Sequence, residues 1–264
     1  ELFLIDAWGT IHNGEKLYPG VATCFAKLNE MGKRVVIFSN APRAEETVSY
    51  KLQQLGLEVG SAIIVTSGMF FLAEVAARTL YCPPHNAKVY VFGKELNSYI
   101  TSALERNYAL ATQIADADFA VMCSFVDSEE LLSQHDEEFK LAITKGVPLL
   151  CPNPDFIAPS GDMFTLTPGA FCKRYENLGG KVYYYGKPYR EFFDFAVKMA
   201  EEASDASFDK SQIIMIGDSL TTDVMGANNY GIDSLLLTQG LHRGEDIANL
   251  IEVLNARPTY IMEQ

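Results

Sequence analysis

The sequence lacks the features that mark membrane, secreted and zinc-binding proteins. No apolar run approaches the ~20 residues that a transmembrane helix needs, and no signal peptide opens the chain. The five cysteines have no paired spacing, which favours neither a zinc cluster nor a disulfide framework. They are Cys24, Cys82, Cys123, Cys151 and Cys172. We therefore expect a cytoplasmic protein with reduced thiols and no membrane partner.

Positive charge is also scarce. The 264 residues contain 21 lysines and arginines against 34 aspartates and glutamates, a formal net charge of −13. The resulting field would repel nucleic acid and anionic membranes, so neither is an expected partner. A small phosphorylated metabolite could bind only where a metal ion or local basic groups reverse that field. Hydrophobic residues make up 48% of the chain, enough for one large packed domain or two smaller ones.

Short apolar runs alternate with helical patterns at both ends of the chain. Strands are expected at residues 2–5, 35–38, 62–65, 182–185, 213–216 and 234–237, and helices at 19–31, 47–55 and 190–203. This alternation is typical of a parallel sheet with right-handed crossovers, and the two ends are expected to form one sheet.

The middle of the chain repeats the pattern on its own. Strands are expected at 89–92, 119–122 and 148–151, and helices at 96–106 and 129–144. The stretch is long enough to fold separately. The predicted fold is therefore an α/β protein with a Rossmann-like parallel-sheet core, residues 1–72 and 183–264, and a large inserted α/β domain, residues 73–182.

Four expected strand ends carry polar side chains that could perform chemistry together. In sequence order they are Asp6, Ser39, Lys187 and Asp218. Ligands of open parallel sheets gather at the carboxyl ends of the strands. Asp6 could attack phosphorus as a nucleophile, while Ser39 and Lys187 could stabilise the transferring phosphoryl group. Asp218, with the nearby Asp223, offers the oxygen ligands that Mg²⁺ prefers.

Each of these residues also has an ordinary structural interpretation. Asp6 and Ser39 could be helix caps or turn residues, and Lys187 could be an exposed loop lysine. Asp218 and Asp223 could be solvated turn residues. Their shared position at expected strand ends favours the functional interpretation.

The same segments resemble the four motifs of haloacid dehalogenase-like hydrolases. The matching segments are Asp6-Ala7-Trp8-Gly9-Thr10, Ser39-Asn40, Gly186-Lys187-Pro188 and Gly217-Asp218-Ser219-Leu220-Thr221-Thr222-Asp223. The long insertion between the second and third motifs, with Asn153-Pro154-Asp155 and Pro168-Gly169-Ala170, is similar to class II, subfamily A. That subfamily includes sugar-phosphate, nucleotide and aryl-phosphate phosphatases.

The resemblance implies a role for each matched position. Asp6 would be the nucleophile, and Asp6, the backbone carbonyl of Trp8 and Asp218 would hold Mg²⁺, with Asp223 supporting the metal or the lysine. The substrate would contact Ser39, Asn40 and Lys187. Asn153 and Asp155 would shape the site, and the insertion would be a mobile cap. Members of the subfamily often dimerise through the cap, so a homodimer is also expected by analogy.

Trp8 departs from the family pattern. Most phosphatases of the family carry a second aspartate there, which protonates the leaving oxygen, and an indole cannot do so. Three alternatives follow: a phosphatase that is slow on alkyl phosphates, a pseudoenzyme that binds a phosphorylated ligand, and a receiver-like regulatory domain. His12 could substitute as the acid, although a solvated loop histidine is its ordinary interpretation. We favour the slow phosphatase.

Overall fold

The computed structural model describes residues 1–84, 86–160 and 163–263, and the chain divides into two compact units. The first unit contains Glu1–Ser39, Glu45–Thr66 and Lys187–Gln264, and the second contains Asn40–Ala44 and Ser67–Gly186. These borders differ by a few residues from the division expected at 72/73 and 182/183. The function of the inserted region as a cap stays a prediction.

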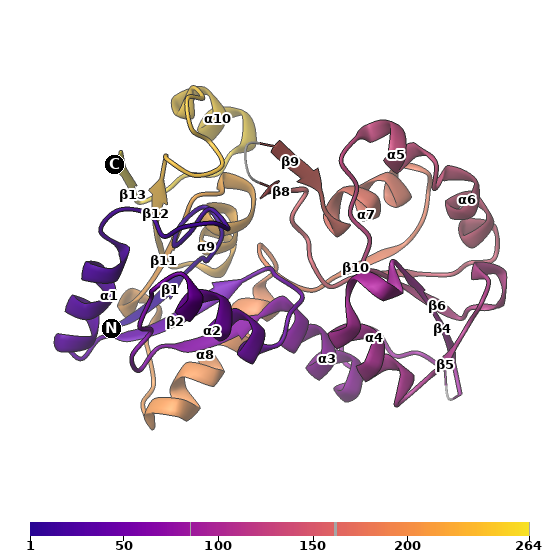
Figure 1. Cartoon of the computed structure of the whole chain (residues 1–264), viewed down its shortest axis with the longest axis horizontal. Helices are drawn as coiled ribbons and strands as arrows, with labels where there is room; N and C mark the ends of the chain where they lie inside the picture. The colour runs from indigo at the N-terminus through magenta and orange to yellow at the C-terminus, as the bar shows by residue number, and fades with distance from the viewer. Residues whose placement is uncertain (85, 161–162, 264) are drawn as a thin grey trace. The chain divides into compact units, whose positions relative to one another are not determined.

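The first unit is built on a six-stranded parallel sheet in the order β13-β12-β11-β1-β2-β3 (Figure 1). Its strands are β1 (Leu2–Ile5), β2 (Arg34–Ser39), β3 (Ile63–Thr66), β11 (Ile213–Gly217), β12 (Asp233–Leu237) and β13 (Tyr260–Met262). Its α-helices are α1 (Val21–Glu30), α2 (Glu45–Gln54), α8 (Arg190–Ser204), α9 (Met225–Tyr230) and α10 (Ile247–Leu254). A five-residue π-helix, Leu220–Val224, precedes α9. The predicted Rossmann-like core is confirmed.

Helices cover both faces of this sheet, which explains why its central strands are apolar throughout. On one face, Ile37 packs in a core cluster with Phe25 of α1 and Leu52 of α2. The neighbouring Phe38 points the other way and stacks on Phe192 of α8, with ring centroids 4.3 Å apart. β1 pairs with β2 on one side and with β11 on the other, so the two chain ends form the centre of one sheet.

The second unit has its own parallel sheet, in the order β10-β7-β6-β4-β5, and a two-stranded antiparallel sheet of β8 and β9. Its strands are β4 (Lys88–Phe92), β5 (Ala109–Leu110), β6 (Phe119–Met122), β7 (Leu149–Cys151), β8 (Ile157–Ser160), β9 (Met163–Leu166) and β10 (Val182–Tyr184). Its α-helices are α3 (Ser67–Ala77), α4 (Ser98–Glu105), α5 (Glu129–Ser133), α6 (Asp136–Thr144) and α7 (Pro168–Asn177). Short 3₁₀ turns span Lys94–Leu96, Ile114–Asp116 and, in the first unit, Lys210–Gln212.

Aromatic side chains fill much of the second unit's core. Phe139 of α6 and Tyr175 of α7 meet edge to face, with centroids 5.3 Å apart, in a cluster that includes Met122 of β6. Phe71 of α3 packs against Tyr185 at 4.9 Å. These buried rings are core residues.

Two sequence expectations about these elements are wrong. The strand at 182–185 was expected in the same sheet as β1, but β10 pairs with β7 in the second unit. The helix expected over 129–144 is two helices, α5 and α6, because the backbone N–H groups of Gln134 and His135 donate to carbonyl oxygens three residues earlier instead of four. No helix in the described part of the chain is long and apolar enough to cross a membrane.

Candidate active site

A buried lysine joins two aspartates at the carboxyl edge of the first unit's sheet. Asp6 follows β1 directly, and its backbone N–H donates to Ile216 O of β11 at 2.8 Å. The Lys187 ammonium donates to Asp6 Oδ1 at 2.5 Å and to Asp223 Oδ1 at 2.7 Å. Lys187 is only 1% exposed, so the alternative of a solvated loop lysine is wrong.

Lys187 reaches this site by a route that the sequence did not indicate. It was expected at the end of a strand of the same sheet, whereas the preceding strand, β10, belongs to the second unit. The chain enters the first unit at Lys187 and continues into α8 at Arg190. The side chain therefore meets Asp6 from the connection before α8, and the other strand ends supply the rest of the site.

Asp218 completes a cluster of three buried carboxylates. It follows β11, and oxygen atoms of Asp6, Asp218 and Asp223 lie within 4.8 Å of one another. Asp223 lies in the π-helix, where its Oδ2 accepts a hydrogen bond from Ser219 N at 3.0 Å. The alternative that Asp218 and Asp223 are solvated turn residues is wrong, since both are buried.

Among the four side chains of this cluster, negative charge exceeds positive charge. Three carboxylates face one ammonium, which leaves two excess negative charges (3 − 1) when all are ionised. Burial, and then the nearby charges of Asp6 and Asp223, raise the pKa of Asp218 well above its usual value. A divalent cation would remove that repulsion, and carboxylate oxygens are the ligands that Mg²⁺ prefers. The donor set therefore fits a magnesium ion.

Two glycines leave room for the Asp218 carboxylate. A Cβ atom at Gly9 would lie 1.8 Å from Asp218 Oδ2, and one at Gly240 would lie 2.1 Å from it. Leu241 N also donates to this oxygen at 2.6 Å. Any side chain at position 9 or 240 would displace the carboxylate, so backbone alone can approach it there.

Ser39 lies at the same edge of the sheet, one strand over from Asp6. It is the last residue of β2, and Ile37, two residues earlier, pairs with Ile5 of β1. Ser39 is 3% exposed. The register therefore places the hydroxyl residue at the end of β2, on the side of β1 opposite β11.

Asn40, Asn153 and Asp155 lie together in the second unit. Asn40 Nδ2 donates to Asp155 Oδ1 at 2.7 Å, and Asp155 N donates to Asn153 Oδ1 at 3.1 Å. Ser67 Oγ lies 2.7 Å from both the Asn40 and Pro152 carbonyl oxygens. This network holds the segment that follows Ser39 in the chain. The functional role of Asn40, Asn153 and Asp155 stays a prediction.

Trp8 is fixed by its own loop. Its half-buried indole meets the His12 ring edge to face at 5.2 Å, and a Cβ at Gly14 would lie 2.4 Å from the indole. His12 is buried, so the expectation of a solvated histidine is wrong. Burial, followed by the charge of Lys51, lowers the pKa of His12 to about 4. Its Nδ1 accepts a hydrogen bond from Gly14 N at 2.9 Å, as a neutral ring does.

Sequence reasoning missed the segment between β12 and α10. Gly240 and Leu241 contact Asp218, and His242 Nε2 accepts a hydrogen bond from Leu220 N at 3.1 Å. The sequence feature that could have indicated this segment is its position, because residue 238 directly follows β12, whose carboxyl end lies at the same edge of the sheet.

Two family models match the chain, and both describe the same group of enzymes. "Haloacid dehalogenase-like hydrolase" matches residues 3–106 and "HAD-hyrolase-like" matches residues 184–264. Together they contain Asp6, Ser39, Lys187, Asp218 and Asp223. The chain belongs to the haloacid dehalogenase-like hydrolases. The receiver-domain alternative is therefore wrong.

Individual relatives agree with this assignment over nearly the full length. The chain is 24% identical to an acid sugar phosphatase of Staphylococcus aureus strain MRSA252, over 98% of this chain and 92% of that protein. It is 24% identical to a 4-nitrophenylphosphatase of Schizosaccharomyces pombe, over 94% of this chain and 86% of that protein. A haloacid dehalogenase-like hydrolase of Brucella suis 1330 shares the fold with a TM-score of 0.84 at 24% identity, covering 99% and 94% of the two chains.

Proposed function

We propose that this chain is a magnesium-dependent phosphatase that hydrolyses small phosphorylated metabolites through an aspartyl phosphate on Asp6. The observation that carries the proposal is the buried contact between the Lys187 ammonium and Asp6, beside two further carboxylates. The names of its relatives, an acid sugar phosphatase and a 4-nitrophenylphosphatase, support the same reaction class.

Asp6 would attack phosphorus, and the bond between phosphorus and the leaving oxygen would break. Lys187 orients the Asp6 carboxylate through their hydrogen bond, and its positive charge would also stabilise the negative charge of the transferring group. Ser39 would contact the phosphoryl oxygens. Water then hydrolyses the aspartyl phosphate and regenerates Asp6.

The magnesium ion would be held by Asp6, Asp218 and the backbone carbonyl of Trp8, with Asp223 in support. When bound, it would balance the excess negative charge and polarise the phosphoryl group. Asp223 also accepts a hydrogen bond from Lys187, which fixes the ammonium between the two aspartates. All of these groups lie within the first unit.

The rate of phosphate release at such a site depends on whether the leaving oxygen must be protonated. Trp8 cannot donate a proton, and His12, with a pKa of about 4, is neutral near pH 7. General acid catalysis is worth about 10²–10⁴-fold. We therefore propose that aryl phosphates, whose leaving group needs little protonation, turn over faster than alkyl phosphates.

Phosphate release from 4-nitrophenyl phosphate tests the proposal directly. Release should require Mg²⁺ and should be lost in Asp6→Asn, which keeps the size of the side chain and removes its nucleophilic charge. Asp194→Asn is the matched control, because Asp194 is an exposed α8 residue whose ion pair with Arg190 lies on the surface. It should retain activity.

The alternative is a pseudoenzyme that binds a phosphorylated ligand, and the observation in its favour is Trp8. It predicts no phosphate release from any member of a panel of sugar phosphates, nucleotides and aryl phosphates, with Mg²⁺ present. Inorganic phosphate or a substrate analogue would nevertheless bind and raise the Tm.

A further inference from the structure

A short segment after β12 contacts the Gly217–Asp223 motif, although it is not part of that motif. We name Gly240, Leu241 and His242 the clamp. Gly240 packs against Asp218 Oδ2, and Leu241 N donates to that oxygen at 2.6 Å. His242 Nε2 accepts a hydrogen bond from Leu220 N at 3.1 Å. The clamp therefore contacts both the carboxylate and the backbone two residues beyond it.

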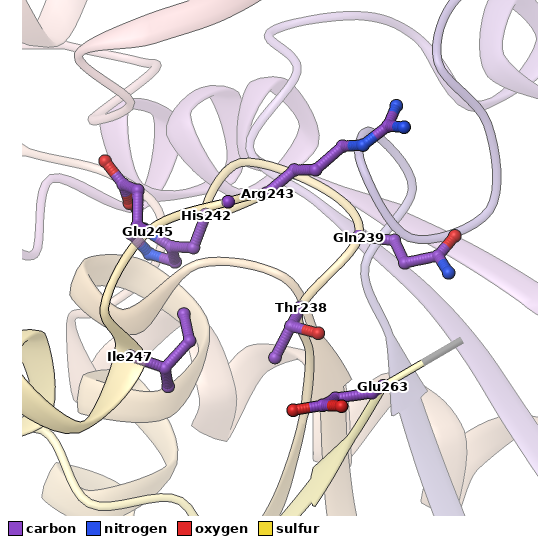
Figure 2. A pocket seen from close by; sticks show the side chains of 8 residues that line it. Thr238, Gln239, His242, Arg243, Glu245, Ile247 and Glu263 are labelled. Carbon is purple, nitrogen blue, oxygen red and sulfur yellow. The ribbon is translucent and has the colours of Figure 1, made fainter.

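The hydrogen bonds of His242 define its tautomer. Since Nε2 accepts from Leu220 N, the ring hydrogen resides on Nδ1, which donates to Glu245 Oε2 at 2.6 Å. The His242 side chain is 9% exposed, whereas the Glu245 side chain is 51% exposed. Figure 2 shows both side chains beside the pocket that this segment lines, with Arg243 extending away from His242. Glu245 thus orients a buried imidazole that supports Leu220.

The clamp also determines which oxygen of Asp218 is available to a cation. Oδ2 lies against Gly9 and Gly240 and accepts the Leu241 hydrogen bond. With Oδ2 engaged by the Leu241 N–H, Oδ1 would be the oxygen that binds a metal ion shared with Asp6. A carboxylate that is held by one oxygen loses less rotational freedom when the other binds a metal.

We propose that His242, oriented by Glu245, is a positioning residue that sets the affinity of the Asp6, Asp218 and Asp223 cluster for a divalent cation. It acts through Leu220 and through the clamp backbone on Asp218, and it does not itself contact the cation. The inference adds to the proposed function, because it concerns cation binding and holds whether or not phosphate is released.

Binding of Mn²⁺ to the metal-free protein, followed by electron paramagnetic resonance in the absence of substrate, tests this role. His242→Leu removes the acceptor for Leu220 N. We expect its Mn²⁺ dissociation constant to rise by about 10- to 100-fold, the usual effect of losing a partner that supports metal ligands. His242→Gln places an amide oxygen near the former Nε2, and its dissociation constant should stay within about threefold of the wild type.

Glu245→Ala keeps the proposal testable even where His242→Leu folds poorly. Glu245 is half exposed, so its removal should leave the fold intact while freeing the imidazole to rotate, and we expect an affinity loss of about three- to tenfold. Glu252→Ala is the control: it removes the same charge from α10, where Glu252 pairs with Arg257 on the surface. Its Mn²⁺ affinity should not change.

A second measurement separates positioning from general destabilisation. If the chain releases phosphate, saturating Mg²⁺ should restore kcat of His242→Leu to within a few-fold, while the Mg²⁺ concentration for half-maximal rate stays raised. Equal Mn²⁺ affinity in wild type, His242→Leu and Glu245→Ala would overturn the proposal. A chain that binds Mn²⁺ in a His242-dependent way but releases no phosphate would refute only the phosphatase function.

Discussion

Replacing Trp8 by aspartate should selectively accelerate the hydrolysis of alkyl phosphates. The substitution places a titratable carboxyl two residues after Asp6, where most phosphatases of the family have one, while the backbone carbonyl at this position remains. General acid catalysis is worth about 10²–10⁴-fold, or about 3–5 kcal/mol of transition-state stabilisation. We expect a gain of about tenfold or more on an alkyl phosphate and about twofold or less on 4-nitrophenyl phosphate.

The same substitution removes packing. The indole contacts His12 and lies close over Gly14, and it is half-buried. Truncating a fully buried tryptophan costs about 3–5 kcal/mol, so about 2 kcal/mol of unfolding free energy should be lost here. Assays should therefore run well below the Tm of the variant, which thermal unfolding establishes first.

Trp8→Asn separates the acid from the loss of packing. Asparagine matches aspartate in size and removes the same indole contacts, but it carries no proton to donate near neutrality. The ratio of alkyl to aryl kcat/KM should rise in Trp8→Asp and stay at the wild-type value in Trp8→Asn. An equal change of this ratio in both variants would refute the reasoning that the missing acid limits alkyl-phosphate turnover.

Two further substitutions test the buried charges. Lys187→Met leaves Asp6 and Asp223 without the ammonium group that they share. It should abolish phosphate release and lower the unfolding free energy, measured by urea titration, by about 3–5 kcal/mol. The control Lys198→Met, on the exposed side of α8, should change neither quantity. The pKa of His12 is lowered to about 4 in the folded state, so stability is lost as pH falls through about 6.5 towards 4, where only the unfolded state binds the proton. Between pH 7.5 and 5 the unfolding free energy should fall by about 2 kcal/mol from this cause. The fall should be absent in His12→Asn, whose amide oxygen can still accept a hydrogen bond from Gly14 N. An identical pH dependence of the unfolding free energy in wild type and variant would contradict a buried neutral imidazole.

Elements with strong local patterns were predictable. β1 ends immediately before Asp6 and β11 immediately before Asp218, as the apolar runs indicated, because strands buried on both faces need continuous hydrophobic sequence. The helix expected at 190–203 is α8, Arg190–Ser204. Periodicity was less informative where helices are short: a single helix was expected over 129–144, yet the chain forms two.

Strand partners were not predictable from the same patterns. The run at 182–184 has the composition of a buried parallel strand, which suits either sheet, and pairing with β7 decides between them. The assignment of Lys187 to a strand end of the first sheet failed for this reason, although its approach to Asp6 is confirmed. An apolar run indicates that a strand is buried, but it does not indicate which strand pairs with it.

The sequence by itself determined the chemical groups of the site and the order in which the chain supplies them, because polar residues that end apolar strands are visible as local pattern. The tertiary structure alone decided how those groups are held. Asp6 and Lys187 are 181 positions apart, and the contact of Leu241 with Asp218 and that of His242 with Leu220 join loops that follow different strands. Such contacts depend on strand order and loop path, which arise from packing of the whole unit and leave no periodic signal in the chain.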